Sequence, residues 1–183
     1  MRVIAGTLKG RRLKPPAWSG LRPTSDKLRE TLFNVLASRV AGSRVLDGYA
    51  GTGAVGIEAL SRGAAHVTFI ERDRRAAALI GENLEACGVA AGYTIERSDV
   101  GAALARLPAE SRFDVIVLDP PYDLADVREV LDAAGRHLGS DGVLVLERAT
   151  RTEPDVPASL TRMRDIRSGD STLTLLMRAG GDQ

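Results

Sequence analysis

Residues 114–122 read Asp-Val-Ile-Val-Leu-Asp-Pro-Pro-Tyr, an apolar run that ends in a carboxylate, two prolines and an aromatic ring. An uninterrupted apolar run is typical of a strand that is covered on both faces, as in a parallel sheet. Because proline cannot continue a central strand, we expect this one to end at Asp119, at the carboxyl edge where such sheets bind ligands. The stretch therefore predicts an α/β fold and locates a candidate site.

The ending Asp119-Pro120-Pro121-Tyr122 suits a flat ring that carries an amino group. The prolines fix φ and lack N–H donors, so they leave acceptor-only backbone beside the Asp119 carboxylate. An NH₂ group can donate to Asp119 and to the Pro120 carbonyl while Tyr122 stacks on the ring, a contact of about 1–3 kcal/mol per base in single-strand binders. The competing interpretation is a strand-ending turn with a buried tyrosine.

Apolar segments and turn residues alternate along the rest of the chain, as in a doubly wound α/β fold. Helices are predicted from a Thr24 cap to Val40, over 54–61 and 73–86, after Asp99, and over 124–138. Strands are predicted at 44–47, 66–70, 93–96, 114–118, 142–147, 160–167 and 172–177. The expected fold is a mostly parallel, seven-stranded sheet with an antiparallel last strand. A small β-hairpin at 2–14 precedes it, so that 1–23 form an extension and 24–183 the main domain.

Length and composition agree with one such domain. The chain has 183 residues, 44% of them apolar, which is enough for a full core. No apolar run approaches the roughly 18 residues that span a bilayer, and the N-terminus lacks the long apolar core of a signal peptide. We therefore expect a cytoplasmic protein with no membrane partner, and a monomer. The single cysteine, Cys87, excludes a cysteine metal cluster and an intrachain disulfide, and no metal is expected.

The charge is unevenly distributed along the chain. Residues 1–39 hold nine basic and two acidic side chains, a net charge of +7, whereas the remainder holds 16 basic and 22 acidic ones, a net charge of −6. A basic segment on an acidic body is expected of a protein with a polyanionic partner, although a solvated hairpin with incidental charge is the alternative. Together with a base-sized pocket it favours nucleic acid. The candidate phosphate contacts are Lys9, Arg11, Arg12, Lys14 and Arg22.

A glycine-rich loop follows the first predicted strand. Residues 46–56 read Leu-Asp-Gly-Tyr-Ala-Gly-Thr-Gly-Ala-Val-Gly, so Gly51, Gly53 and Gly56 satisfy the dinucleotide fingerprint G-x-G-x-x-G. Glu71 lies 20 residues after Gly51, where a ribose-binding acid belongs. A nicotinamide-dependent dehydrogenase is therefore a competing interpretation.

Two details favour a methyl donor over a dinucleotide. The strand is expected to end at Asp47, so three residues (48–50) separate it from Gly51, the first glycine of the fingerprint. In a dinucleotide-binding loop the first glycine usually follows the strand with fewer residues between. The prolines after Asp119 have no evident task in hydride transfer. A loop that begins with an acid and opens on glycines suits a cationic, amino-acid-bearing nucleoside, S-adenosylmethionine.

These residues resemble the Rossmann-like, class I methyltransferases that use S-adenosylmethionine and modify exocyclic amines. Further segments are similar to the RsmD family, the 16S ribosomal RNA guanine-N2 methyltransferases. The likeness is dense over residues 2–123 and thin in the tail. The segments that carry it are 2–6, 9–13, 21–27, 29–34 and 58–63.

The resemblance implies roles for the loop and for the strand ends. The loop would hold the methionine part of the donor, Glu71 would accept the ribose hydroxyls, and Asp99 and the Val100 N–H would contact the adenine. The alternative for Asp99 is a helix cap. The implied donor-binding set is Asp47, Gly48, Tyr49, Gly51, Gly53, Glu71, Arg72, Asp99 and Val100, and the catalytic set is Asp119, Pro120, Pro121 and Tyr122.

The resemblance also implies a substrate and a partner. Guanine N2 of 16S rRNA would be methylated, with S-adenosylhomocysteine as the second product, and the RNA would be bound within a small-subunit assembly particle. Alternatives are a DNA or RNA amino-methyltransferase acting on adenine N6 or cytosine N4, and a catalytically silent assembly factor. Deleting residues 2–14 is expected to weaken RNA binding without unfolding the sheet.

Overall fold

The computed structural model describes residues 1–18, 25–121 and 124–180, and it contains one seven-stranded sheet. The strands are β1 (Arg44–Gly48), β2 (His66–Ile70), β3 (Tyr93–Glu96), β4 (Phe113–Leu118), β5 (Leu138–Ala149), β6 (Leu160–Ser168) and β7 (Ser171–Arg178). They lie in the order β3-β2-β1-β4-β5-β7-β6, and only β7 runs antiparallel to its neighbours. The predicted fold class and all seven predicted strands are confirmed.

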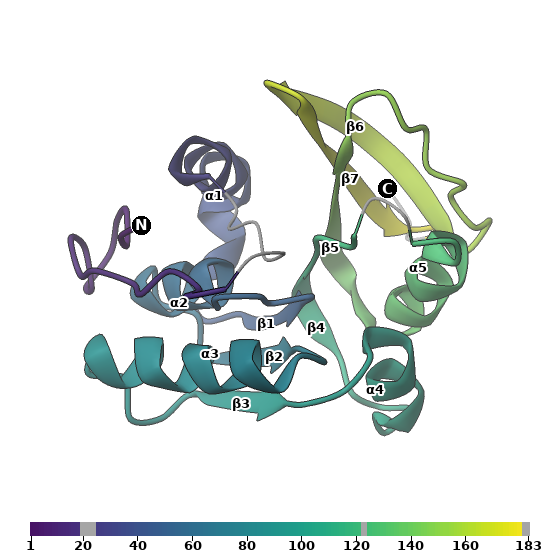
Figure 1. Ribbon diagram of the computed structural model, residues 1–183. Coiled ribbons are helices and arrows are strands. Elements are labelled where there is room, and N and C mark those ends of the chain that lie inside the picture. The colour runs from purple at the N-terminus through teal and green to yellow at the C-terminus, as the bar shows by residue number, and fades with distance from the viewer. Residues whose placement is uncertain (19–24, 122–123, 181–183) are drawn as a thin grey trace.

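Helices cover both faces of the sheet (Figure 1). The helices are α1 (Asp26–Val40), α2 (Ala54–Ser61), α3 (Arg74–Ala86), α4 (Val100–Arg106) and α5 (Val127–Arg136). Apolar side chains of α1, α2 and α3 pack in one core cluster, and those of α4 and α5 pack in a second cluster on the opposite face. Because the central strands are buried on both sides, their sequences are apolar runs without alternation. No helix among the described residues is long and apolar enough to cross a membrane.

The strand order reverses between β1 and β4, which lie side by side in the middle of the sheet. Both run in the same direction, with Asp47 opposite Val117 and Gly48 opposite Leu118. The Asp119 N–H donates to the Gly48 carbonyl oxygen at 3.4 Å and so extends the pairing past the end of β4. In open α/β sheets ligands bind beyond the carboxyl ends of the strands at such a reversal.

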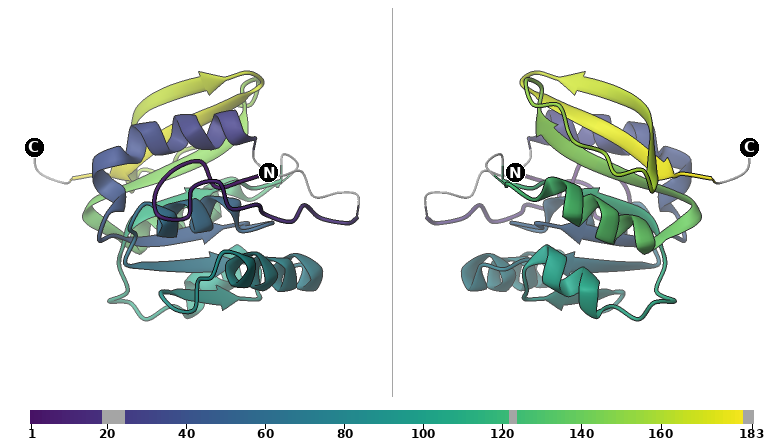
Figure 2. Two further views of the ribbon diagram at one scale, coloured as in Figure 1. Left: turned by 90° about the vertical axis from the view of Figure 1, so that its left-hand side faces the viewer. Right: turned by 90° about the vertical axis from the view of Figure 1, so that its right-hand side faces the viewer.

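The last two strands form a hairpin at the edge of the sheet opposite β3 (Figure 2). The turn contains Gly169 in the left-handed region, with φ of 62°, as predicted from the Gly-Asp pair at this point. Helix α1 contacts β6 and lies along this end of the molecule. The hairpin thereby brings residues 170 and 171 to the carboxyl end of β5.

Several element boundaries differ from the predicted ones, and for three of them the structure shows the reason. Helix α1 is capped by Ser25, whose Oγ accepts the Leu28 N–H at 3.1 Å; the predicted cap, Thr24, lies outside the described residues. Helix α5 begins at Val127 because residues 124–126 form a turn after the prolines, in which the Leu124 N–H donates to the Pro121 carbonyl. Strand β5 is longer than predicted because its first residue, Leu138, already pairs with β4.

The N-terminal segment packs into the main core. Its predicted hairpin is reduced to one antiparallel bridge, between Arg2 and Arg12. Val3 and Leu13, at 1% and 2% exposure, belong to the same apolar cluster as α1, α2 and α3. The segment is therefore part of the folded body.

Buried hydrogen bonds also hold this segment in place. The fully buried Glu58 carboxylate on α2 accepts the N–H groups of Ile4 at 2.7 Å and Ala5 at 2.9 Å. The Asn83 side chain on α3 accepts the Lys14 N–H at 2.7 Å. Removing the segment would leave these groups without their donors, at a cost of about 1–3 kcal/mol each, which argues against the expectation that residues 2–14 can be deleted without unfolding the sheet.

We predict that deleting residues 2–14 lowers the free energy of unfolding substantially. Loss of buried Val3 and Leu13 alone accounts for about 3–6 kcal/mol, against a typical total of about 5–15 kcal/mol. The measurement is urea unfolding followed by circular dichroism. A control that replaces only the exposed Arg11 and Arg12 by Gln should stay within about 0.5 kcal/mol of the parent. A deletion variant with the parent's urea midpoint would contradict this assignment.

Candidate active site

A cavity of about 750 Å³ opens at the carboxyl edge of the sheet. This volume is typical of small-molecule sites. The ends of β1, β2, β4 and β5 line it, together with the first turns of α1 and the β6–β7 turn. Among the predicted site residues that are described, the cavity is lined by Asp47, Tyr49, Gly51, Glu71, Arg72, Asp99, Val100, Asp119, Pro120 and Pro121.

Asp47 is a buried carboxylate on the floor of this cavity. It is 3% exposed, and its Oδ2 accepts the Gly56 N–H, in the first turn of α2, at 2.8 Å. Burial raises the pKa of Asp47 from 3.8 to about 7, the Gly56 hydrogen bond opposes this rise, and the charge of Glu71 adds to it. A cationic ligand group would stabilise the ionised form.

Glu71 joins the two loops that form this end of the cavity. Its Oε2 accepts the Gly51 N–H at 2.9 Å and its Oε1 accepts the Asp73 N–H at 2.8 Å. Each oxygen can accept a second hydrogen bond. Glu71 therefore fixes the glycine loop against β2 and retains the capacity to accept two hydroxyl groups.

The glycines of the loop have different tasks. Gly51 and Gly53 adopt positive φ values of 55° and 76°, which other residues rarely adopt. A Cβ at Gly56 would lie 2.1 Å from Cε1 of Phe69 on β2, so Gly56 allows α2 to approach the sheet. A Cβ at Gly48 would lie 2.6 Å from Cδ2 of Leu118. Gly48 and Gly53 do not line the cavity.

Tyr49, Arg72 and Asp99 lie together at the β1–β3 end of the cavity. Tyr49 has a φ of 62°, and its pKa is raised to about 12 by burial and by the charge of Asp99, with Arg72 opposing. Asp99 caps α4, because its Oδ1 accepts the Ala102 N–H at 3.1 Å. The helix-cap interpretation of Asp99 is thus confirmed, while its position in the cavity lining leaves the adenine contact as a prediction.

The opposite end of the cavity is formed by the end of β4 and its neighbours. Asp119, Pro120 and Pro121 line it, whereas Tyr122 lies outside the described residues.

The side chain of Trp18 also lines the cavity, with the Arg75 guanidinium 4.8 Å from its ring centroid. The linker after the basic segment thus reaches the mouth of the site.

Glu147 is a cavity residue that the sequence analysis missed. It stands near the end of β5, is 8% exposed, and accepts a hydrogen bond from the Ser171 hydroxyl at 3.2 Å. Burial raises its pKa, and the Ser171 hydrogen bond opposes the rise. The available clue was the apolar run 143–146, which ends in Glu147 as the run before Asp119 ends in a carboxylate.

The four predicted RNA-contacting residues that the structure describes do not line this cavity. Lys9, Arg11, Arg12 and Lys14 are exposed, and the Lys14 ammonium forms an exposed ion pair with Glu82 at 3.0 Å. Arg22 lies outside the described residues. Trp18, which lines the cavity, comes four residues after Lys14, so the basic segment leads directly along the chain to the cavity.

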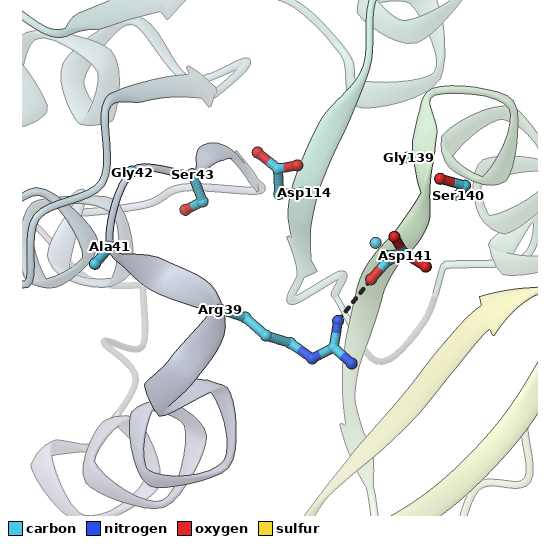
Figure 3. A pocket seen from close by; sticks show the side chains of 9 residues that line it. Arg39, Ala41, Gly42, Ser43, Asp114, Gly139, Ser140 and Asp141 are labelled. Atoms are coloured by element: carbon cyan, nitrogen blue, oxygen red, sulfur yellow. Dashed lines mark hydrogen bonds between the residues drawn. The ribbon is translucent and has the colours of Figure 1, made fainter.

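A second hollow, of about 390 Å³, lies at the amino edge of the sheet (Figure 3). Two of its charged side chains are already engaged: Arg39 donates to the Asp141 carbonyl at 2.6 Å (Figure 3), and Asp114 accepts the Arg44 N–H at 2.7 Å. In the described part of the chain, no group of three or more His, Cys, Asp or Glu could hold a metal ion. The cavity at the carboxyl edge is therefore the candidate site.

Comparison with known proteins identifies the family of the chain. The family model described as Conserved hypothetical protein 95 matches residues 1–177. Ribosomal RNA small subunit methyltransferase D of Escherichia coli (strain K12) is 34% identical over 97% of the chain and 90% of its own length. The chain belongs to the RsmD family. The putative rRNA methyltransferase YlbH of Bacillus subtilis (strain 168) is 36% identical over 98% of the chain and its own full length.

Solved structures show the same architecture. A putative methyltransferase from Escherichia coli superposes with a TM-score of 0.86 at 31% identity, with 97% of each chain covered. A hypothetical protein from Thermus thermophilus superposes with a TM-score of 0.82 at 32% identity, over 97% of this chain and 99% of that one. The RsmD-type fold thus extends over nearly the whole chain.

We predict that Asp47→Asn stabilises the ligand-free protein above neutral pH. The folded-state pKa lies above the ordinary value, so stability falls as the pH rises from about 4 to about 7 and Asp47 loses its proton. Three pKa units correspond to about 4 kcal/mol, and the unpaired Asn amide should reduce the gain to about 1–2 kcal/mol. Urea unfolding at pH 5 and pH 8 measures this. Equal pH dependence in parent and variant would refute the assignment.

Proposed function

We propose that the chain transfers a methyl group from S-adenosylmethionine to the exocyclic N2 amine of a guanine in 16S ribosomal RNA. The observation that carries the proposal is that Asp47 and the Asp119-Pro120 edge, from adjacent strands, line one cavity. Membership of the RsmD family and the rRNA methyltransferase names of the relatives support it. S-adenosylhomocysteine would be the second product.

The β1–β2 end of the cavity fits the donor. S-adenosylmethionine supplies a methyl group on a positively charged sulfur, which a nucleophile can attack. Asp47 and backbone carbonyl groups of its loop would hold the ammonium of the methionine part, and a cation there offsets the cost of burying the Asp47 charge. Glu71 would accept the two ribose hydroxyls with its remaining capacity, and Asp99 and Val100 would contact the adenine.

The β4 end fits the acceptor amine. The lone pair of an aromatic amine is delocalised into its ring, which makes the nitrogen a poor nucleophile. If Asp119 accepts one of its protons and the Pro120 carbonyl the other, the nitrogen becomes pyramidal and its lone pair is held in one direction. The carboxylate also offsets the positive charge that builds on the amine.

These roles do not require Asp119 to remove the proton. A carboxylate of ordinary pKa is a weak base, and the ammonium product releases its proton to water afterwards. We assign Asp119 and Pro120 to orientation and charge stabilisation, Pro121 to holding the turn, and Tyr122 to stacking on the base. These four residues form the catalytic set that we propose for contact with the substrate.

The partner that fits this arrangement is folded ribosomal RNA. Lys9, Arg11 and Arg12 are exposed on a segment that is packed firmly on α2 and α3, so their charges are presented from a rigid base. We assign them, with Lys14 and Arg22, to phosphate contacts. The proposed substrate is a small-subunit assembly particle, bound by a monomer.

The decisive test is mass spectrometry of digested RNA after incubation with methyl-labelled donor. Small subunits that lack the modification should yield N2-methylguanosine, and naked 16S RNA should yield less. Asp119→Asn should lower turnover by about 10²–10³-fold, because it removes a charge aimed at the reacting amine. Donor affinity, measured by calorimetry, should change less than twofold.

Three outcomes would count against these assignments. N6-methyladenosine or N4-methylcytosine as the product would replace the guanine proposal by the corresponding amino-methyltransferase. Loss of donor binding in Asp119→Asn, with an unchanged single-turnover rate, would contradict its role at the acceptor. Absence of any labelled nucleoside from both substrates would leave only a binding function.

We predict that RNA affinity depends steeply on salt. Each neutralised phosphate contributes a slope of about 0.7–0.9 in log affinity against log salt. Replacing Lys9, Arg11 and Arg12 together by Gln should therefore reduce the slope by about two to three units. Fluorescence anisotropy between 50 and 300 mM salt, roughly the range in which such contacts weaken, measures it. The matched control, Arg128→Gln with Arg136→Gln on the opposite face, should leave the slope unchanged.

A further inference from the structure

Two carboxylates stand side by side at the acceptor end of the cavity. Leu118 of β4 lies opposite Leu146 of β5 in a parallel register, so Asp119 and Glu147 are the next residues on the two strands. Both line the cavity. Neighbouring strands lie about 4.8 Å apart, so the two backbone positions are separated by about one strand spacing. This spacing suits two acceptors that contact adjacent donors on one base edge.

Glu147 has the properties of a ligand-binding group. It is more than nine-tenths buried, yet among the described residues its only hydrogen bond comes from the Ser171 hydroxyl to Oε1. The second oxygen, Oε2, has no protein donor in the described part of the chain. Oε2 is not one of the fully buried side-chain atoms that lack a partner, so it is not an orphaned buried charge. A carboxylate oxygen can accept two hydrogen bonds, so Oε2 has the capacity to accept a donor from a ligand in the cavity.

The turn between β6 and β7 holds Glu147 in place. Glu147 pairs with Leu173 of β7, and Ser171 follows the Gly169 turn at the beginning of the same strand. The antiparallel hairpin therefore supplies both the backbone neighbour and the hydroxyl that orients the carboxylate. Because this arrangement depends on the sheet and not on a loose loop, the position of Oε1 is set by the pairing of β5 with β7, and the carboxylate stands in the cavity lining.

The donor pattern of guanine matches these two acceptors. On its Watson–Crick edge, guanine carries the N1–H beside the N2 amine, whereas adenine and cytosine present a lone pair beside their amino groups. Enzymes that act on an extruded base read this edge by hydrogen bonds. A carboxylate next to Asp119 would bind guanine and repel the ring lone pair of adenine or cytosine.

We propose that Glu147 accepts the N1–H of the target guanine while Asp119 holds its N2 amine, and that Glu147 thereby makes the site specific for guanine. This inference rests on the proposed function and adds a specificity-determining residue to it. Hydrogen bonding of the N1–H to the carboxylate also favours its ionised form, which burial alone disfavours.

The experiment compares guanine with 2-aminopurine at the target nucleotide. 2-Aminopurine keeps the N2 amine but has a lone pair, not a hydrogen, at N1. RNA with either base, ligated into 16S RNA and assembled into small subunits, is methylated by the parent, by Glu147→Gln and by a control, Glu85→Gln, on the exposed face of α3. The readout is the ratio of kcat/KM values for the two bases, and calorimetry of donor binding verifies that each variant is folded.

The parent should prefer guanine by about 10–100-fold, the effect expected for a specific base-edge contact. Glu147→Gln should reduce or reverse the preference, because its amide can donate to the 2-aminopurine N1. The control should behave as the parent does. The test compares the guanine-to-2-aminopurine ratio of the variant with the same ratio of the parent. Any intrinsic difference in reactivity of the two amines enters both ratios equally and therefore cancels.

The outcomes separate this inference from the proposed function. If the parent forms N2-methylguanosine but methylates both bases equally, or if Glu147→Gln keeps the parental ratio, the inference is overturned and the proposed function stands. If the parent places the methyl group on another atom or base, both are overturned. Should Glu147→Gln fail to bind donor, Ser171→Ala, which removes only the hydroxyl that orients Oε1, supplies the second ratio: a preference reduced from the parental one supports the inference, and an unchanged one overturns it.

Discussion

The site depends on the close pairing of β1 with β4. Gly48 has no side chain, and Leu118 occupies the space that a Cβ would need, so the two strands remain in register up to their last residues. The Asp119 N–H then bonds to the Gly48 carbonyl. This contact fixes the distance between the loop that begins after Gly48 and the proline turn that begins after Asp119. A transfer reaction between groups bound at these two strand ends needs such a fixed separation, because small misplacements of the reacting atoms greatly reduce rates.

Buried carboxylates organise the β1–β2 end of the cavity at a cost in stability. Asp47 holds the first turn of α2, and Glu71 holds Gly51, so the protein shapes the loop before any ligand binds. Burial raises the pKa of Asp47 to about 7, which means that its ionised form is disfavoured where no cation lies beside it. A cationic ligand offsets this penalty, so part of the binding free energy of a positively charged donor is already stored in the fold. Functional sites in natural proteins commonly sacrifice stability in this way.

Sequence patterns predicted the strands and the acidic residues at their ends well. A buried parallel strand is a long apolar run in the sequence, so the polar residue that ends the run is easily recognised. Asp47, Glu71 and Asp119 were found on this basis. Glu147 was missed because β5 was expected to end there as an ordinary strand, and only the folded hairpin shows that Ser171 and a buried cavity surround it. The roles of Gly48 and Gly56 in packing could not be predicted either, since their neighbours Leu118 and Phe69 come from distant segments.

The N-terminal segment is packed into the core, and the exposed cations that it carries are the ones proposed to contact RNA. Its apolar side chains, Val3 and Leu13, point into the core, while Lys9, Arg11 and Arg12 remain exposed. The sequence alone indicated a small basic β-hairpin outside the large sheet, and gave no sign that its residues 3 and 13 belong to the main core. Once the segment is anchored through Glu58, its cations lose little conformational freedom on binding beyond that of their own side chains. A pre-organised basic surface binds a rigid, folded RNA more tightly than a flexible arm with the same charge.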